Sequence, residues 1–226
     1  MKRLTRDQRG TTLVELVVGM ASGLVVMVGL TTLILVTLHT TSRVSARVDA
    51  TQTSRLTLNR VIDQLHSACI APKVPPIRKE SSSTELRFIH APGSAVAPVP
   101  TLTTITYSAG ALTQSDYDWK EGTAPFWVFK TTPSRTIALT DRVAPITGKP
   151  IFSYHGYVSG TLSTTTLTVP LSELDASRTI HVTVAFMATP RNGNSEEATP
   201  ARIQGSATLR LTASSYNPAA PSLPCQ

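Results

Sequence analysis

The sequence has little of what enzyme chemistry requires. Its histidines are scattered, with no metal-ligand spacing among themselves or with the two cysteines. They are His39, His66, His90, His155 and His181. A Gly-x-Ser-x-Gly nucleophile motif and a phosphate-binding glycine loop are both missing. The acidic residues Asp116, Asp118 and Glu121 lack EF-hand spacing, which favours a solvated acidic turn over a Ca²⁺ loop. We therefore expect a protein that is not an enzyme and that holds no metal and no cofactor.

Charged side chains are absent from one long stretch. After Glu15 no Lys, Arg, Asp or Glu occurs before Arg43, and the run is mostly apolar. A helix rises ~1.5 Å per residue and needs about 20 apolar residues to cross a hydrocarbon core, so residues 13–38 are long enough. An ionised carboxylate in lipid costs at least ~2.5 kcal/mol. Glu15 therefore needs a partner, a function or a place near the headgroups.

Proline is absent before Pro72, so the helix is expected to continue well beyond the membrane-spanning part. Its second half has a stripe of residues at alternating spacings of four and three, typical of one helix face. The stripe consists of Val44, Val48, Thr51, Arg55, Leu58, Ile62, Leu65 and Cys69, widened by Val61 and Ala68. Thr51 and Arg55 interrupt a coiled-coil pattern. We expect this face to pack on a sheet.

Aromatic residues make up only 5% of the chain, and its Thr, Ser, Ala and Val content suits strands with modest side chains. Short alternating runs separated by Gly, Pro and Ser turns predict an antiparallel sheet. The expected strands are 85–90, 101–108, 111–114, 126–130, 135–139, 151–154, 162–169, 179–188 and 201–213, with a tight turn at Ala109-Gly110. The aromatic residues Trp119, Phe126, Trp127 and Phe129 either join the core or form a surface for a partner, and the core is favoured.

The amino-terminal phrase Arg9-Gly10-Thr11-Thr12-Leu13-Val14-Glu15-Leu16 follows a leader containing Lys2, Arg3 and Arg6. It resembles the signature of type IV pilins and of the pseudopilins of type II secretion. The resemblance implies cleavage after Gly10 by a prepilin peptidase, methylation of the new terminus at Thr11, and a role for Glu15 in subunit assembly. Thr11 departs from the Phe that the family prefers. The order of the later short phrases loosely resembles the larger minor pilins, the J-type pseudopilin and W-type minor pilin group.

The resemblance implies a pilin-like α+β fold. Residues 1–10 would be the leader, 11–71 a long helix whose transmembrane part is about 13–38, and 72–226 a β-rich globular domain. The expected function is that of a minor pilin or pseudopilin, a structural subunit of a type IV pilus or type II secretion pseudopilus. It would enter the inner membrane by a single pass and then join a fibre, with prepilin peptidase and other pilin subunits as partners. The alternative is an uncleaved membrane-anchored protein whose extracellular β-domain binds a ligand or partner.

Positive charge alone does not indicate nucleic-acid binding. The whole chain has a net charge of +7, but removing the four basic and one acidic residues of the first ten leaves 17 basic and 13 acidic residues, or +4. No dense basic run or aromatic-interleaved patch accompanies this excess. Nucleic acid is therefore expected as a partner only if the fibre serves DNA uptake.

The two cysteines, Cys69 and Cys225, lie at the end of the expected helix and near the end of the chain. In an oxidising compartment they could form a disulfide, which would close a long loop and stabilise the fold by roughly 5 kcal/mol. The alternative is two unrelated thiols.

Overall fold

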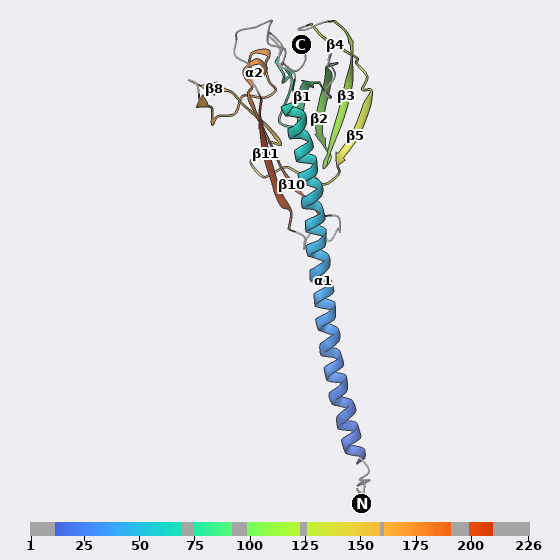
Figure 1. The fold of residues 1–226 in the computed structure, drawn as a ribbon. Helices are drawn as coiled ribbons and strands as arrows, with labels where there is room; N and C mark the ends of the chain where they lie inside the picture. The colour runs from blue at the N-terminus through green and yellow to red at the C-terminus, as the bar shows by residue number, and fades with distance from the viewer. Residues whose placement is uncertain are drawn as a thin grey trace, which may run out of the picture. The chain divides into compact units, whose positions relative to one another are not determined.

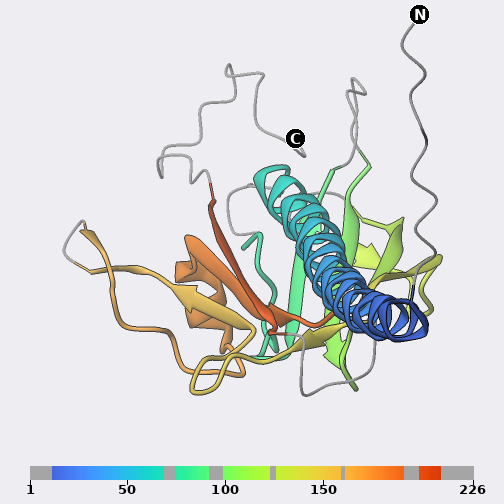
Figure 2. The same cartoon turned by 90° about the horizontal axis from the view of Figure 1, so that it is seen from below.

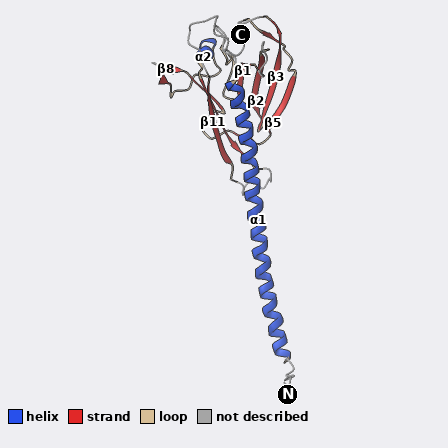
Figure 3. Cartoon of the chain, viewed as in Figure 1, coloured by secondary structure: helices blue, strands red, loops and turns tan. Residues whose placement is uncertain are grey.

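The structure is a computed structural model, and it describes residues 12–68, 75–91, 99–122, 126–158, 161–190 and 199–209. The chain divides into two compact units, Met1–Ser45 and Ala46–Gln226. The described part is an α+β structure with one long helix, one short helix and antiparallel strands (Figure 3).

The first unit contains the amino-terminal part of helix α1 (Leu13–His66). Thr12 caps the helix, because its carbonyl accepts a hydrogen bond from the Leu16 N–H at 3.2 Å and its hydroxyl accepts one from the Glu15 N–H at 3.4 Å. No side chain of residues 12–45 is buried in the chain. The most apolar window of the helix has a mean hydropathy of 2.2, so among the described residues this helix is long and apolar enough to span a membrane.

Hydroxyl groups in the apolar part of α1 are satisfied within the helix. Thr31, Thr32 and Thr37 each donate a hydrogen bond to the carbonyl four residues earlier, at 2.8 to 2.9 Å. Such internal bonds remove the need for water around a hydroxyl and are therefore compatible with a lipid environment. The threonines do not weaken the membrane interpretation of this segment.

The second unit begins with the remainder of α1, whose buried residues are Ala50, Ser54, Thr57, Leu58, Val61 and Leu65. The predicted stripe is confirmed at Leu58, Val61 and Leu65. It is wrong at Val48, which is 48% exposed, and at the exposed Arg55. The buried face instead begins at the small residues Ala50, Ser54 and Thr57 before it reaches Leu58. Figure 2 shows this part of α1 beside strands of both sheets.

The first sheet is antiparallel and contains five strands, β1 to β5, drawn mostly in green in Figure 1. They are β1 (Glu85–His90), β2 (Thr101–Ser108), β3 (Ala111–Glu121), β4 (Val128–Phe129) and β5 (Arg135–Thr140). The order is β1-β2-β3-β4, and β5 also pairs with β3. Ala109 and Gly110 form the expected tight turn, both with positive φ, 48° and 83°. Strand β3 extends seven residues beyond its predicted end, and β4 is shorter than predicted.

The second sheet is also antiparallel and has the order β11-β10-β6, with β7 pairing β10 beside β6. Its strands are β6 (Val143–Ala144), β7 (Phe152–His155), β10 (His181–Ala188) and β11 (Ala201–Thr208). A separate hairpin joins β8 (Tyr157–Val158) to β9 (Thr161–Leu162). The predicted strand 162–169 is wrong beyond Leu162, where the chain forms turns and loops.

The short helix α2 (Glu173–Arg178) was not anticipated. Its amino terminus carries a recognisable signal, since the Ser172 hydroxyl accepts a hydrogen bond from the Asp175 N–H at 3.1 Å. A serine followed three residues later by an acidic residue is the pattern of a helix start. The helix has only six residues, too few for an apolar stripe to show in the sequence.

One core joins the two sheets to the helix. It includes Leu58, Val61 and Leu65 from α1, Phe88 from β1 and Phe186 from β10, all almost completely buried. A Cβ added to Gly205 of β11 would lie 2.8 Å from side-chain atoms of Leu58 and Ile62, so this glycine permits the close approach of α1 to β11. The predicted packing of the helix on an antiparallel β-domain is therefore confirmed.

Candidate functional site

Only one of the predicted site residues lies in the part of the chain that the structure describes. Glu15 is in the first turn of α1. The predicted cleavage and methylation positions, Gly10 and Thr11, and both cysteines, Cys69 and Cys225, lie outside the described residues.

Glu15 is exposed, and its carboxylate forms no ion pair with any described residue. Its position in the first helical turn places it at the positive end of the helix macrodipole, which stabilises a negative charge there. The flanking side chains Val14 and Leu16 are 68% and 52% exposed. The arrangement presents one acceptor of hydrogen bonds and ion pairs within an otherwise apolar helix surface.

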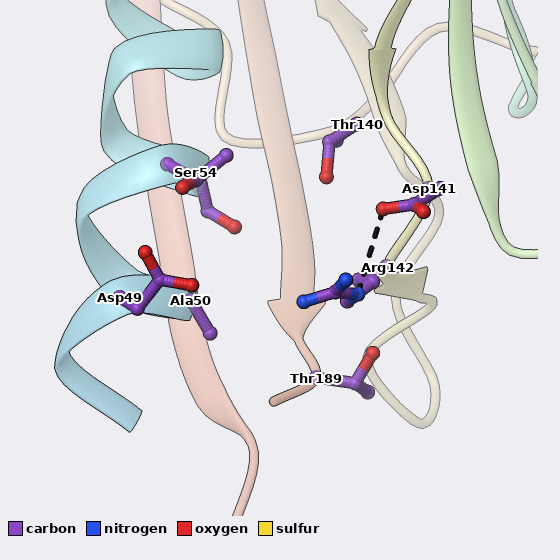
Figure 4. A pocket seen from close by; sticks show the side chains of 8 residues that line it. Asp49, Ala50, Ser54, Thr140, Asp141, Arg142 and Thr189 are labelled. Atoms are coloured by element: carbon purple, nitrogen blue, oxygen red, sulfur yellow. Dashed lines mark ion pairs between the residues drawn. The ribbon is translucent and has the colours of Figure 1, made fainter. Parts of the chain in front are cut away.

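A second candidate is a polar cavity of about 250 Å³ in the unit Ala46–Gln226. Its walls are α1, the turn after β5 and the end of β10 (Figure 4). The lining residues are Asp49, Ala50, Thr53, Ser54, Thr140, Asp141, Arg142 and Thr189. In Figure 4 the Arg142 side chain points across the cavity toward α1.

The polar groups of this cavity are incompletely paired within the chain. Ser54 is 2% exposed and Thr140 8% exposed, yet neither hydroxyl hydrogen-bonds to a described residue. The Arg142 Nε lies 3.5 Å from an Asp141 carboxylate oxygen, a weak contact to a side chain that is 77% exposed. The cavity can therefore hydrogen-bond a small polar molecule. The carboxylates of Asp49 and Asp141 offset the charge of the Arg142 guanidinium, so the cavity has no net preference for anions.

The third candidate is a chain of buried polar side chains that connects α1 to the first sheet. His90 contacts the Ser67 hydroxyl through Nδ1 at 3.3 Å and the Thr103 hydroxyl through Nε2 at 3.0 Å. Thr103 then donates a hydrogen bond to the Asp116 carboxylate at 2.7 Å, and Gln114 donates another at 2.8 Å. Burial lowers the pKa of His90, while the negative charge of Asp116 partly opposes that effect.

This chain of groups is structural in character. The Ser67 hydroxyl donates its hydrogen bond to the Gln64 carbonyl at 2.8 Å, which competes with donation to His90. A nucleophilic serine would need a base free to accept its proton. Ser67 and His90 line an open groove beside α1. The contacts of the described residues in this groove do not form an activated nucleophile.

The aromatic and acidic residues between Asp116 and Phe129 differ in part from what the sequence predicts. The aromatic residues divide: Trp127 and Phe129 pack on a small cluster around Ile89, whereas Phe126 is 79% exposed and Trp119 is 39% exposed. The expected acidic turn is wrong, because Asp116 lies on strand β3, as does Asp118. A strand forms there because β2 and β5 both pair with β3 at Asp116.

The acidic side chains of β3 are held by hydrogen bonds. Asp118 accepts bonds from Lys130 at 2.9 Å and from Ser134 at 2.8 Å, and these contacts lower its pKa. Within the described ranges, no group of three or more His, Cys, Asp or Glu side chains is placed to hold a metal ion.

The sequence predicts neither the cavity around Arg142 nor the buried hydrogen bonds of His90. Neither set of residues is close in sequence, and neither follows a motif. The only local sign was the group of short polar residues, including Ser54, that interrupts the apolar face of α1.

No protein-family model matches the chain, and no curated protein matches it.

Proposed function

We propose that this chain is a minor pilin or pseudopilin, a structural and non-enzymatic subunit of a type IV pilus or type II secretion pseudopilus. The observation that carries the proposal is Glu15, an exposed carboxylate in the first turn of a helix that has no other charged side chain before Arg43. A simple membrane anchor does not need a carboxylate there, since the charge makes insertion less favourable.

The proposed role of Glu15 is to bind a neighbouring subunit. Cleavage after Gly10 would create a positively charged α-amino group on Thr11. In a fibre the apolar helix surfaces of residues 13–38 would pack together, and water would be excluded from around them. A charge pair between Glu15 and the amino terminus of a neighbour would be stronger in that environment than in water. It would also select one register between subunits.

The proposal includes a location and partners. The basic leader would stay in the cytoplasm by the positive-inside rule, and the β-domain would lie on the other side of the inner membrane. Prepilin peptidase would process the chain, which would then join other pilin or pseudopilin subunits in a periplasmic or cell-surface fibre. The exposed apolar part of α1 supports both the membrane and the fibre environment.

The first experiment tests processing. The full chain is expressed with and without a prepilin peptidase, and the mature amino terminus is measured by intact-mass spectrometry. We expect loss of residues 1–10 only with the peptidase, and a mass consistent with a methyl group on Thr11. Gly10→Val should block the cleavage, whereas the matched change Gly19→Val should not. An unchanged amino terminus in both strains would contradict the proposal.

The second experiment tests assembly. Glu15→Gln keeps the size of the side chain but removes its charge, so we expect normal membrane insertion and a several-fold lower amount of the protein in sheared fibres. Asp63→Asn is the matched control, because Asp63 is an exposed carboxylate on the same helix outside the apolar part. An uncleaved anchor that binds a partner through its β-domain would tolerate both changes equally.

A further inference from the structure

Two histidines lie side by side on the second sheet. His155 of β7 is the register partner of His181 of β10, and His181 is in turn the partner of Thr208 on β11. Directly opposed residues of an antiparallel pair point to the same face, with Cβ atoms about 4.5–5.5 Å apart. The adjacent residues Tyr154 and Val182 are fully buried, so the histidine row lies on the face turned away from the core.

Each of the two imidazole rings is held by a contact of its own Nδ1 atom. The Nδ1 of His155 lies 3.1 Å from the Ser163 carbonyl oxygen. A carbonyl only accepts, so Nδ1 carries the hydrogen and the lone pair of the neutral ring is on Nε2. The Nδ1 of His181 lies 3.0 Å from the Thr208 hydroxyl. No described residue forms a hydrogen bond with Nε2 of either ring.

This is the arrangement of metal-binding histidines, in which one ring nitrogen binds the ion and the other is held by a carbonyl or another polar group. The separation of the rings also fits. Their centres are 5.8 Å apart. A metal–nitrogen bond of about 2.0–2.1 Å places the ion about 3.2 Å from a ring centre, so two rings on one ion have centres at most about 6.4 Å apart.

We propose that His155 and His181 form a binding site for one divalent transition-metal ion, with Nε2 of each ring as a ligand. Because no third His, Cys, Asp or Glu side chain joins them within the described residues, water completes the coordination. Imidazole suits Cu²⁺, Ni²⁺ and Zn²⁺, and Cu²⁺ binds such a site most tightly. The site is independent of the proposed fibre function, since it needs neither Glu15 nor processing at Gly10.

The test uses the full chain in detergent with Cu²⁺ as the probe. We expect one equivalent to bind and its electron paramagnetic resonance spectrum to show splitting by two imidazole nitrogens. His155→Asn and His181→Asn should each weaken binding at least tenfold and remove one of the two nitrogen couplings. Thr208→Ala keeps both rings but releases one of them, so it should weaken binding several-fold.

His39→Asn and His66→Asn are the matched controls, because both residues lie on α1 and are exposed. Neither change should alter the affinity or the spectrum. A wild-type spectrum with fewer than two nitrogen couplings would overturn the proposal without reference to any variant. An affinity that survives both His155→Asn and His181→Asn, or that falls equally in His66→Asn, would also overturn it.

Discussion

Tyr154 shows how a single polar group is accommodated in the core. Its side chain is fully buried on β7, and its hydroxyl lies 3.0 Å from the Ser82 carbonyl and 2.9 Å from the Glu85 carbonyl. Burial raises the pKa of this phenol, so it remains a neutral donor across the physiological range. The hydroxyl therefore links β7 of the second sheet to the start of β1 in the first sheet.

We expect Tyr154→Phe to destabilise the protein by about 1–2 kcal/mol, because buried carbonyls lose a hydrogen-bond donor while the apolar packing is kept. Thermal unfolding of the full chain in detergent measures the effect. Tyr157→Phe is the control, since Tyr157 is 56% exposed and should leave the midpoint unchanged. Equal midpoints for Tyr154→Phe and the wild type would show that the hydroxyl contributes nothing to the link.

At the scale of elements, Gly205 determines how closely strand β11 and helix α1 approach each other. A Cβ at this position would lie 2.8 Å from the Ile62 Cδ1 and from the Leu58 Cδ2, and 3.2 Å from the Leu58 Cγ. Contacts under 3.0 Å force atoms to move. The tips of both side chains are flexible, but the Leu58 Cγ is nearer its backbone and limits the adjustment.

We expect Gly205→Ala to cost about 1–3 kcal/mol through overpacking between α1 and β11. Thermal unfolding again gives the measurement, and Ser206→Ala, at an exposed neighbouring position, should have little effect. Combining Gly205→Ala with Leu58→Val should restore part of the loss if the clash is the cause. A double variant whose loss equals the sum of the two single losses would assign the cost of Gly205→Ala to another cause.

Elements with strong local patterns were predicted best. Strand β1 has its predicted bounds, Glu85–His90, and so does β2, because alternation and the adjoining turn specify both. The helix was predicted from uninterrupted apolar and proline-free sequence. The strand predicted after Leu162 was wrong. The Thr-rich composition of this segment favours a strand, but the segment forms no strand pairing in the structure. Propensity alone does not supply a pairing partner.

At the scale of the whole molecule, the exposed apolar part of α1 and the remainder of the chain should differ in solubility in water. Residues 12–45 have no buried side chain, whereas the remainder has its own core. We expect a protein starting at Ala46 to fold and remain soluble without detergent, and the full chain to require detergent. Circular dichroism and size-exclusion chromatography would check both, and an unfolded or aggregated shorter protein would show that the amino-terminal segment is needed for folding.

The stability of the whole fold should also depend on pH. The pKa values of His90 and His181 are lowered in the folded protein, mainly by burial, so the folded state binds protons less readily than the unfolded chain. Their stabilising contribution is complete above the unfolded pKa of about 6.5 and is lost as the pH falls through the folded values. The pKa of the Asp118 carboxyl is also lowered in the folded protein. Because the ordinary pKa of a carboxyl is already acidic, the contribution of Asp118 to stability changes only at lower pH.

We therefore expect the unfolding midpoint of the metal-free protein to fall between pH 7 and pH 5, by roughly 2–4 °C for each 1 kcal/mol lost. His181→Asn should reduce this dependence, and His39→Asn should leave it unchanged. A midpoint that is constant across this range would contradict the assigned direction of both shifts.

The sequence by itself determined the local features of this protein. The charge-free segment, the proline-free helix, the tight turn at Ala109-Gly110 and most strand positions follow from neighbouring residues and backbone preference. The same local information placed Glu15 at the start of the apolar run, and the hypothesis of a fibre subunit rests on that position.

Only the tertiary structure decided which distant residues meet. It placed Ala50 and Ser54 on the buried face of α1. It also paired His155 with His181 across two strands, and it connected His90 to Asp116 by hydrogen bonds through Thr103. These contacts depend on strand register and on the distance between helix and sheet, which are set by the whole core. The charge-free segment between Glu15 and Arg43 could be predicted from the sequence because its cause is local. The histidine pair could not be predicted, because it depends on the register of two strands.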